Sequence, residues 1–260
     1  MKGARFLTID RSPPRSAGLS AEARAWHRRR AVQLAAAAGA VAPMLALGVW
    51  IYLLRDETMT ITGMLLGPLL GGGSLIFWLL ALHIFVCGDE LSSLGFRLPE
   101  PWREAGSGVI LGFLLLGLHL AFQSTIAPLF PRRPPAEEIV ELLAELSRNP
   151  WLIAIWLGPV VWIGVAGFEE LWKAFVLRRL WRVWPGPVGR WASLLVVSAL
   201  FGVGHGYQGP AAIVSIALQT IVMGWLYMLT GRIRALIVAH AVYDSIQVLA
   251  AVVAIRAATA

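Results

Sequence analysis

The sequence predicts an all-α fold: a polytopic membrane helical bundle of about seven transmembrane helices. Hydrophobic residues make up 58% of the chain and charged residues only 14%, with a mean hydropathy of +0.70, whereas water-soluble domains carry about 25% charged residues. Several apolar runs reach the ~20 residues that a helix needs to cross a bilayer. The runs are continuous and rich in Leu and Ala, which favours helices over strands. The predicted spans cover residues 31–54, 61–87, 106–130, 151–177, 190–206, 211–230 and 234–255.

The first 30 residues precede the predicted bundle and differ from it in composition. They are polar, contain prolines, and carry Lys2 and seven arginines. The segment is too long and too charged for the start of a signal peptide, and no cleavage site follows a short apolar core. We expect residues 1–30 to form a basic cytoplasmic tail that rests on anionic lipid. The net charge of +7 therefore indicates orientation rather than nucleic-acid binding.

The distribution of arginines predicts the orientation of the chain in a bacterial cell membrane. With the N-terminus in the cytoplasm, most Lys and Arg residues outside the spans fall on the inner side, in agreement with the positive-inside rule. Beyond the tail, the inner arginines are Arg97, Arg103, Arg178, Arg179, Arg182, Arg190, Arg232 and Arg234, and the outer ones are Arg55, Arg132, Arg133, Arg148 and Arg256. The only cysteine, Cys87, excludes an intramolecular disulfide and a C-x-x-C site.

Residues 31–150 are predicted to hold N-terminal transmembrane helices and an amphipathic connector. Within residues 131–150, apolar side chains recur at i, i+3, i+4 and i+7, and glutamates fill the other side. This spacing predicts a helix lying on the outer interface, which is either a tether or a lid. Gly71–Gly73 and the glycine-rich end of the fifth span are typical of close helix packing.

Ionisable residues interrupt the fourth span. The stretch GVAGFEELWKAFVL, residues 164–177, places Glu169, Glu170 and Lys173 in an otherwise apolar helix. A charge at mid-helix costs roughly 2.5–3.5 kcal/mol, so pairing or burial toward the bundle must offset it. Lys173 lies at i+4 from Glu169 and at i+3 from Glu170, which favours an ion pair. A structural ion pair near the inner interface, with Lys173 snorkelling, would have the same spacing.

Two further spans carry ionisable pairs. SALFGVGHGYQG has Phe201 and His205 one helical turn apart, and LIVAHAVYDSIQ has His240 and Asp244 one turn apart. The carboxylate of such a pair can hold the imidazole in one tautomer. Isolated histidines, His83 and His119, are expected to be packing residues with satisfied hydrogen bonds, and the sixth span brings no charge.

These motifs meet only if the fifth span departs from a simple crossing. In the seven-span topology, Glu169 and His240 lie toward the inner side, whereas His205 lies near the outer end of a short fifth span. We therefore expect the fifth segment to be tilted, re-entrant, or to begin earlier, from about Trp181. Non-helical backbone at depth is tolerated where it is buried in protein or lines a wet cavity.

The order Glu-Glu, Phe-x-x-x-His and His-x-x-x-Asp over residues 150–250 resembles the CAAX-protease and bacteriocin-processing (CPBP) family. These intramembrane glutamic endopeptidases include the type II CAAX prenyl endopeptidases, and the resemblance implies a catalytic four-helix core over 151–255. The first motif departs from the family pattern, Glu-Glu-x-x-x-Arg. Here Ala174 occupies the Arg position and Lys173 precedes it, which is similar to the Glu-Glu-x-x-Lys of PrsW-type proteases.

The resemblance implies hydrolysis of a peptide bond in a membrane-anchored protein or peptide, with no cofactor and no metal. Glu169 would be the base that activates water, and Glu170 and Lys173 would set its pKa and orientation. His205 would position the water or the scissile carbonyl. The oxyanion-binding side would consist of His240 and Asp244. Phe201 would support the site.

Three other interpretations of the ionisable residues stay open. Glu, His and Asp are all possible zinc ligands, although the H-E-x-x-H arrangement is missing. A transporter or proton relay would also bury Glu and His, although its inverted repeats or paired broken helices are not seen. A catalytically inactive membrane adaptor would keep the same fold.

Overall fold

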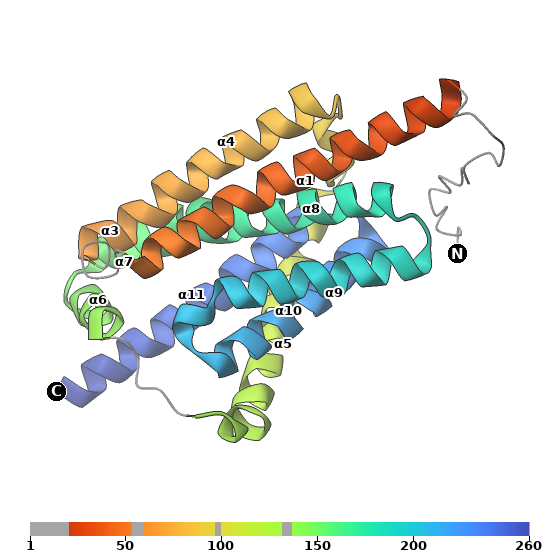
Figure 1. Cartoon of the computed structure of the whole chain (residues 1–260). Helices are drawn as coiled ribbons and strands as arrows, with labels where there is room; N and C mark the ends of the chain where they lie inside the picture. The colour runs from red at the N-terminus through yellow and green to blue at the C-terminus, as the bar shows by residue number, and fades with distance from the viewer. Residues whose placement is uncertain (1–20, 54–59, 97–99, 132–136, 260) are drawn as a thin grey trace.

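The computed structural model describes residues 21–53, 60–96, 100–131 and 137–259, in which all regular structure is helical (Figure 1). The long helices are α1 (Ala21–Leu53), α5 (Pro101–Thr125), α8 (Phe168–Val183), α9 (Pro187–Gly204), α10 (Pro210–Thr230) and α11 (Arg234–Thr259). Shorter helices are α3 (Ile61–Leu66), α4 (Gly73–Ala81), α6 (Glu137–Arg148) and α7 (Pro150–Ile155). Segments η1 (Gly67–Gly72), η2 (Leu82–Val86) and η5 (Trp156–Gly167) have π-helical hydrogen bonds, and η3 (Leu91–Leu94), η4 (Ala127–Leu129) and η6 (Gly206–Gln208) are 3₁₀ turns.

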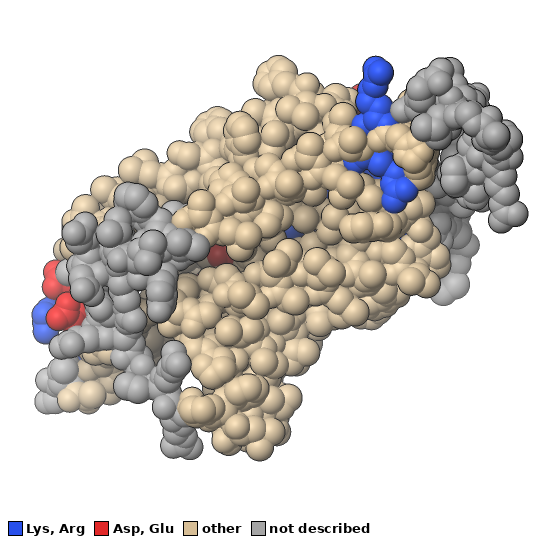
Figure 2. Space-filling model, in the orientation of Figure 1, with Lys and Arg blue, Asp and Glu red and all other residues tan. Residues whose placement is uncertain are grey.

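The predicted all-α membrane bundle is confirmed. Within the described residues, six helical stretches are long and apolar enough to cross a membrane: Gly67–Val86, Pro101–Leu129, Pro150–Val183, Pro187–Gly204, Pro210–Thr230 and Arg234–Ala258. Figure 2 shows charged residues gathered at the two ends of one face, with a nearly uncharged band between them and acidic and basic atoms recessed within that band. The distribution of charge agrees with an integral, multi-pass membrane protein.

Helix α1 contains the first predicted span but is not one of these six stretches. It packs along α8 and begins at Ala21, ten residues before the predicted start of the first span at residue 31. The stretch AEARAWHRRR consists mainly of good helix formers, so the helix extends beyond the apolar run. Residues 1–20 of the predicted tail lie outside the described residues.

Proline begins most of the later spans. Pro101, Pro150, Pro187 and Pro210 each occupy the start of a helix, where the missing N–H would have no intrahelical partner and the fixed φ suits the helix. Each of these helices therefore begins a few residues earlier than, or at, the predicted apolar boundary.

The fourth span is longer than the predicted 151–177. The chain stays helical from Pro150 to Val183, with a kink at Gly158, which precedes Pro159 and has non-helical angles. Glu169 lies 14 residues before Val183, or about 21 Å along the helix, and so near the middle of the span rather than its inner end. The arginines after residue 177 suggested an interface, but Arg179 is fully buried.

A tight turn folds α9 back along α8. The turn contains Gly186, whose φ of +92° is a conformation that L side chains rarely adopt. Because α9 starts at Pro187, His205 stands at its far end, about 27 Å from the turn. The two helices are antiparallel, so His205 and Glu169 arrive close together. Of the alternatives we expected, α9 begins earlier than residue 190, but at Pro187 rather than Trp181, and it is a regular helix rather than a re-entrant segment.

Glycines allow two close helix crossings. A Cβ on Gly72 would meet Gly164 O at 2.3 Å, which places η1 directly against η5. Of the predicted packing glycines Gly71–Gly73, only Gly72 lies at this crossing, because nothing lies within 4 Å of a Cβ at Gly71 or Gly73. Gly108 and Gly112 of α5 face α11, where a Cβ would lie 2.6 Å from Val238 Cβ and 2.9 Å from Ala239 O, respectively. The second crossing holds the helix that carries His240 and Asp244.

Helix α6 packs on α11 through part of its apolar face. Its apolar residues Leu142 and Leu146 are 4% and 0% exposed, in a cluster with Val252 of α11. The Arg256 Nε of α11 donates to Ser147 O at 2.8 Å. The amphipathic periodicity is therefore confirmed, and part of the apolar face packs against α11, while the interfacial position stays a prediction. Pro134 and Pro135, expected to start the helix, lie outside the described residues.

Candidate active site

Three helices bring the predicted site residues together. Glu169 and Glu170 come from the first turn of α8, His205 from the end of α9, and His240 and Asp244 from α11. The Nε2 atom of His205 lies 3.7 Å from Glu169 Oε1, and the Nε2 atom of His240 lies 3.6 Å from Glu169 Oε2. One imidazole therefore faces each oxygen of the Glu169 carboxylate.

Glu170 is the buried centre of a second set of contacts. Its Oε1 accepts hydrogen bonds from Lys173 Nζ at 2.5 Å and from His240 Nδ1 at 2.7 Å. The side chains of Glu170 and Lys173 are only 2% and 6% exposed. Lys173 therefore does not snorkel to an interface. It pairs with Glu170, the i+3 partner, within the bundle.

Asp244 is the most exposed of the ionisable side chains in the cluster. Its Oδ2 is 3.4 Å from His240 Nε2, one helical turn away on α11, as the i, i+4 spacing predicts. Its side chain is 22% exposed, compared with 16% for Glu169, 18% for His205 and 13% for His240. Glu170 is thus enclosed, whereas the residues around Glu169 keep partial access.

Backbone and carboxylate acceptors select the tautomers of the two imidazoles. His205 Nδ1 donates to Phe201 O at 2.9 Å, because a carbonyl only accepts. His240 Nδ1 donates to the carboxylate of Glu170, which also accepts a hydrogen bond from Lys173. Both Nε2 atoms are left to face Glu169, where each accepts a hydrogen bond when neutral and donates one when protonated.

An aromatic wall supports these groups. Lys173 Nζ lies 4.4 Å from the Phe201 ring centroid, and the Phe201 ring lies 4.8 Å from that of His205. The Trp172 ring stands 5.9 Å from Phe201, and its Nε1 donates to Ala40 O of α1 at 2.9 Å. The Phe201 ring thus lies between the Lys173 ammonium and the His205 imidazole, and the hydrogen bond from Trp172 to α1 holds the Trp172 ring in place.

The site contains more acidic groups than permanent positive charges. Glu169, Glu170 and Asp244 stand against Lys173 alone, in an environment where unpaired carboxylates are costly. The imidazoles of His205 and His240 can carry the additional protons, and coupled groups of this kind titrate as a set. A proton can therefore move between Glu169 and either imidazole without changing the total charge of the site.

The two isolated histidines have partners outside this site. Arg179 Nη2 donates to His83 Nδ1 at 2.6 Å, so His83 is neutral and its Nε2–H donates to Glu90 O at 3.0 Å. His119 Nδ1 is hydrogen-bonded to the Tyr243 hydroxyl at 2.9 Å. Both agree with the expected packing role.

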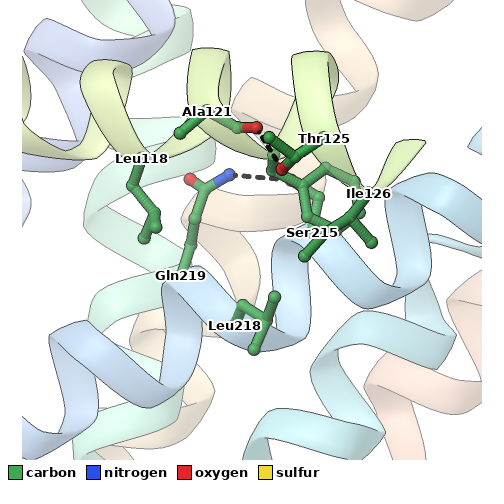
Figure 3. Close-up of a pocket in the computed structure, with 8 residues that line it drawn as sticks. Leu118, Ala121, Thr125, Ile126, Ser215, Leu218 and Gln219 are labelled. Carbon is green, nitrogen blue, oxygen red and sulfur yellow. Dashed lines mark hydrogen bonds between the residues drawn. The ribbon is translucent and has the colours of Figure 1, made fainter. Parts of the chain in front are cut away.

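The sixth predicted span corresponds to α10, which carries no charge but has buried polar side chains that the sequence prediction did not include. Gln219 Nε2 donates to Ser215 Oγ at 3.3 Å and to the Tyr243 hydroxyl at 3.1 Å. Ser215 and Gln219 also line a cavity of about 130 Å³ between α5 and α10 (Figure 3), which includes none of the site residues. In the sequence, these buried polar contacts could have been predicted from the i, i+4 spacing of Ser215 and Gln219 in an otherwise apolar helix.

Among the described residues, no group of three or more His, Cys, Asp or Glu side chains is arranged to hold a metal ion. Whether zinc takes part in the reaction is tested by the chelation experiment described below.

Comparison with known proteins finds one matching family model, which covers part of the chain. Residues 149–246 match the family model described as type II CAAX prenyl endopeptidase Rce1-like. Searches of curated proteins and of solved structures find no match. The matched segment runs from the start of α7 into α11, and it contains all of the residues assembled around Glu169 and Glu170.

Proposed function

We propose that this chain, whose residues 149–246 are similar to a CAAX-type intramembrane protease family, is a glutamic-type intramembrane endopeptidase. Its substrates are membrane-anchored proteins or peptides. The observation that carries the mechanism is the position of Glu169, with the Nε2 atoms of His205 and His240 at 3.7 and 3.6 Å from its two oxygens.

In the proposed reaction, Glu169 is the general base. It removes a proton from a water molecule as the water oxygen attacks the scissile carbonyl carbon, and a tetrahedral intermediate forms. Protonated His240, supported by Asp244, donates to the developing oxyanion, and His205 positions the water or the carbonyl. Glu169 then passes its proton to the leaving nitrogen as the C–N bond breaks, which yields a carboxylic acid and an amine.

Glu170 and Lys173 have an indirect role in this proposal. Glu170 receives hydrogen bonds from both Lys173 and His240 through one oxygen. It fixes the His240 tautomer and keeps the ammonium close to the site without contacting the substrate. The division of labour between the adjacent carboxylates follows from their exposure, because only Glu169 is accessible to a reacting water.

The deciding experiment is cleavage of a membrane-anchored reporter peptide by purified protein in detergent or nanodiscs, followed by mass spectrometry. Glu169→Gln keeps the shape of the side chain but removes its basicity, and is expected to abolish cleavage. Glu100→Gln is the matched control, because Glu100 forms an exposed ion pair with Arg103 far from the site. Cleavage by the Glu169→Gln protein at the wild-type rate would refute the proposal.

Metal dependence is tested on the same reporter. Cleavage is expected to survive prolonged chelation. Stoichiometric zinc in active protein, together with loss of cleavage on zinc removal and recovery on readdition, would favour the zinc mechanism instead.

A further inference from the structure

A small cavity lies behind Glu170, between α8, α10 and α11. Glu170 and Lys173 line one side, and Thr220 and Gly224 of α10 line the other. The volume available to the centre of a water molecule is about 10 Å³, close to what a single buried water requires. The nature of the surrounding polar groups decides whether such a space holds water.

Lys173 has an unused hydrogen-bond donor on this side. Its ammonium group has three N–H bonds. One donates to Glu170 Oε1 at 2.5 Å, and the Phe201 ring lies 4.4 Å away on another side. Within the described residues, no acceptor is found for the remaining N–H. A buried cation with an unmet donor is costly unless another acceptor is present.

Glu170 and Thr220 supply the complementary groups. Lys173 and His240 both use Glu170 Oε1, which leaves Oε2 without a hydrogen bond among the described residues. Thr220 is 2% exposed, and its hydroxyl makes no hydrogen bond within the described part of the chain. The nearby Tyr227 hydroxyl is already used, because it donates to Leu94 O at 3.0 Å.

We propose that this cavity binds one water molecule, which accepts from Lys173 and bonds to Glu170 Oε2 and the Thr220 hydroxyl. Three partners are typical of a buried water. The water would hold the ammonium against Glu170, so Thr220 is a positioning residue for the site, a role that rests on the proposed function. Helix α10 would thereby contribute to a site whose charged residues all come from other helices.

Two substitutions separate the hydroxyl from the shape of Thr220. Thr220→Val keeps the volume and removes the hydroxyl, whereas Thr220→Ser keeps the hydroxyl. We expect a structure of the wild-type chain at a resolution that resolves waters to show one peak within hydrogen-bond distance of Lys173 Nζ and Thr220 Oγ1. The peak should persist in Thr220→Ser and be lost in Thr220→Val. A dry wild-type cavity would overturn the proposal.

The functional part is read from the pH dependence of kcat/KM on the reporter peptide. With its water lost, Lys173 favours the ionised carboxylates less, so the acidic limb in Thr220→Val is expected to move upward by roughly 0.5–1 pH unit. Thr220→Ser should keep the wild-type limb. An unshifted limb in Thr220→Val would overturn the positioning role. A wild-type protein that cleaves no peptide would refute the proposed function, while the water peak would still decide the binding site.

Discussion

At the residue scale, the site is organised by the unequal environments of two adjacent carboxylates. Glu170 is enclosed and shares one oxygen between Lys173 and His240, whereas Glu169 keeps 16% exposure and faces the Nε2 atoms of both imidazoles. Neighbouring residues on a helix point about 100° apart. A single turn of α8 can therefore direct one acid into the core and the other toward reacting groups.

Lys173 provides the first residue-scale prediction. Lys173→Ala removes the cation that favours the ionised carboxylates, so the acidic limb of the pH–rate profile should move upward. The free energy of unfolding should fall by up to about 3–5 kcal/mol, because a buried ion pair loses one partner. The remaining bond from His240 to Glu170 should reduce that loss. The checks are the pH dependence of kcat/KM and the yield of folded protein, and an unchanged profile would deny Lys173 any part in tuning the base.

A second variant tests the departure from the family spacing. Lys173→Ala combined with Ala174→Arg returns the cation to the commoner position, at i+4 from Glu170, and should recover part of the activity and yield. Ala174 is 2% exposed, so Ala174→Arg alone should overpack the core and lower the yield. If the double variant is no better than Lys173→Ala, the two spacings are not interchangeable in this bundle.

The spacing of the charged residues could be predicted from the sequence, and so could a Glu–Lys pair. The choice of Glu170 over Glu169 as the partner of Lys173 could not, since both spacings are favourable in a helix and tertiary contacts with His240 decide between them. The polar groups of α10 were missed for a different reason. Thr220 and Gln219 are uncharged, and a search for costly ions does not detect them.

At the element scale, the α5–α11 crossing depends on two glycines that periodicity alone did not identify. Gly108→Ala would place a methyl group 2.6 Å from Val238 Cβ and 2.7 Å from Ala235 O, which forces the helices apart. We expect a loss of about 1–3 kcal/mol in stability and reduced activity, because α11 carries His240.

Gly117→Ala is the matched control on the same helix. Nothing lies within 4 Å of a Cβ at this position, so the substitution should be neutral or slightly stabilising. Thermal unfolding in detergent and reporter cleavage measure both variants. Equal stability of the Gly108→Ala and Gly117→Ala proteins would mean that the crossing is not tightly packed.

The lengths of the helices were predicted less well than their existence. The fourth span seemed to end at 177 because three arginines follow within five residues. In the structure, Arg179 is enclosed by Gln33 Oε1 at 2.8 Å, Asp89 Oδ2 at 2.5 Å and His83 Nδ1 at 2.6 Å. A buried arginine looks like an interface residue in a sequence, because its partners come from segments 90 to 146 residues away.

This arginine network predicts a pH-dependent stability. Burial alone would raise the pKa of Asp89, but hydrogen bonds from Arg182 and Arg179 lower the pKa below its ordinary value of 3.8. A carboxyl whose pKa is lower when folded stabilises the protein above the unfolded pKa. That stabilisation is lost as the pH falls from about 4 through the lower folded value. Asp89→Asn should destabilise the protein at pH 7 and lessen its loss of stability between pH 5 and pH 3, as measured by thermal unfolding in detergent.

The exposed ion pair between Glu100 and Arg103 is the control for this experiment. Its side chains are 42% and 77% exposed, so Glu100→Gln should change stability by less than about 1 kcal/mol. A pH dependence in Asp89→Asn identical to that of the wild type would assign the acid sensitivity to other carboxyls.

At the scale of the whole molecule, the charged residues visible on one face gather at the two ends of the bundle (Figure 2). The start of α5, the end of α8 and the starts of α9 and α11 lie together at one end, where Arg103, Arg182, Arg190, Arg232 and Arg234 are found. Helix α6 and the end of α11 lie at the other (Figure 1). Glu169 lies between the ends, about 21 Å along α8 from Val183 and 19 residues after Pro150. The proposed chemistry would therefore take place at depth in the bilayer.

The orientation of this axis is the last prediction, and it follows from the positive-inside rule. In a Cys87→Ser background, single cysteines replace Arg103 at the arginine-rich end and Glu141 on the exposed side of α6. In intact cells, a membrane-impermeant maleimide should label Glu141→Cys and not Arg103→Cys, which should react only after permeabilisation. Reporter cleavage by both variants would establish that each folds. The opposite labelling pattern would mean that the protein has the inverse orientation in the membrane. In that case the end of α9 that carries His205 would face the cytoplasm rather than the outer side.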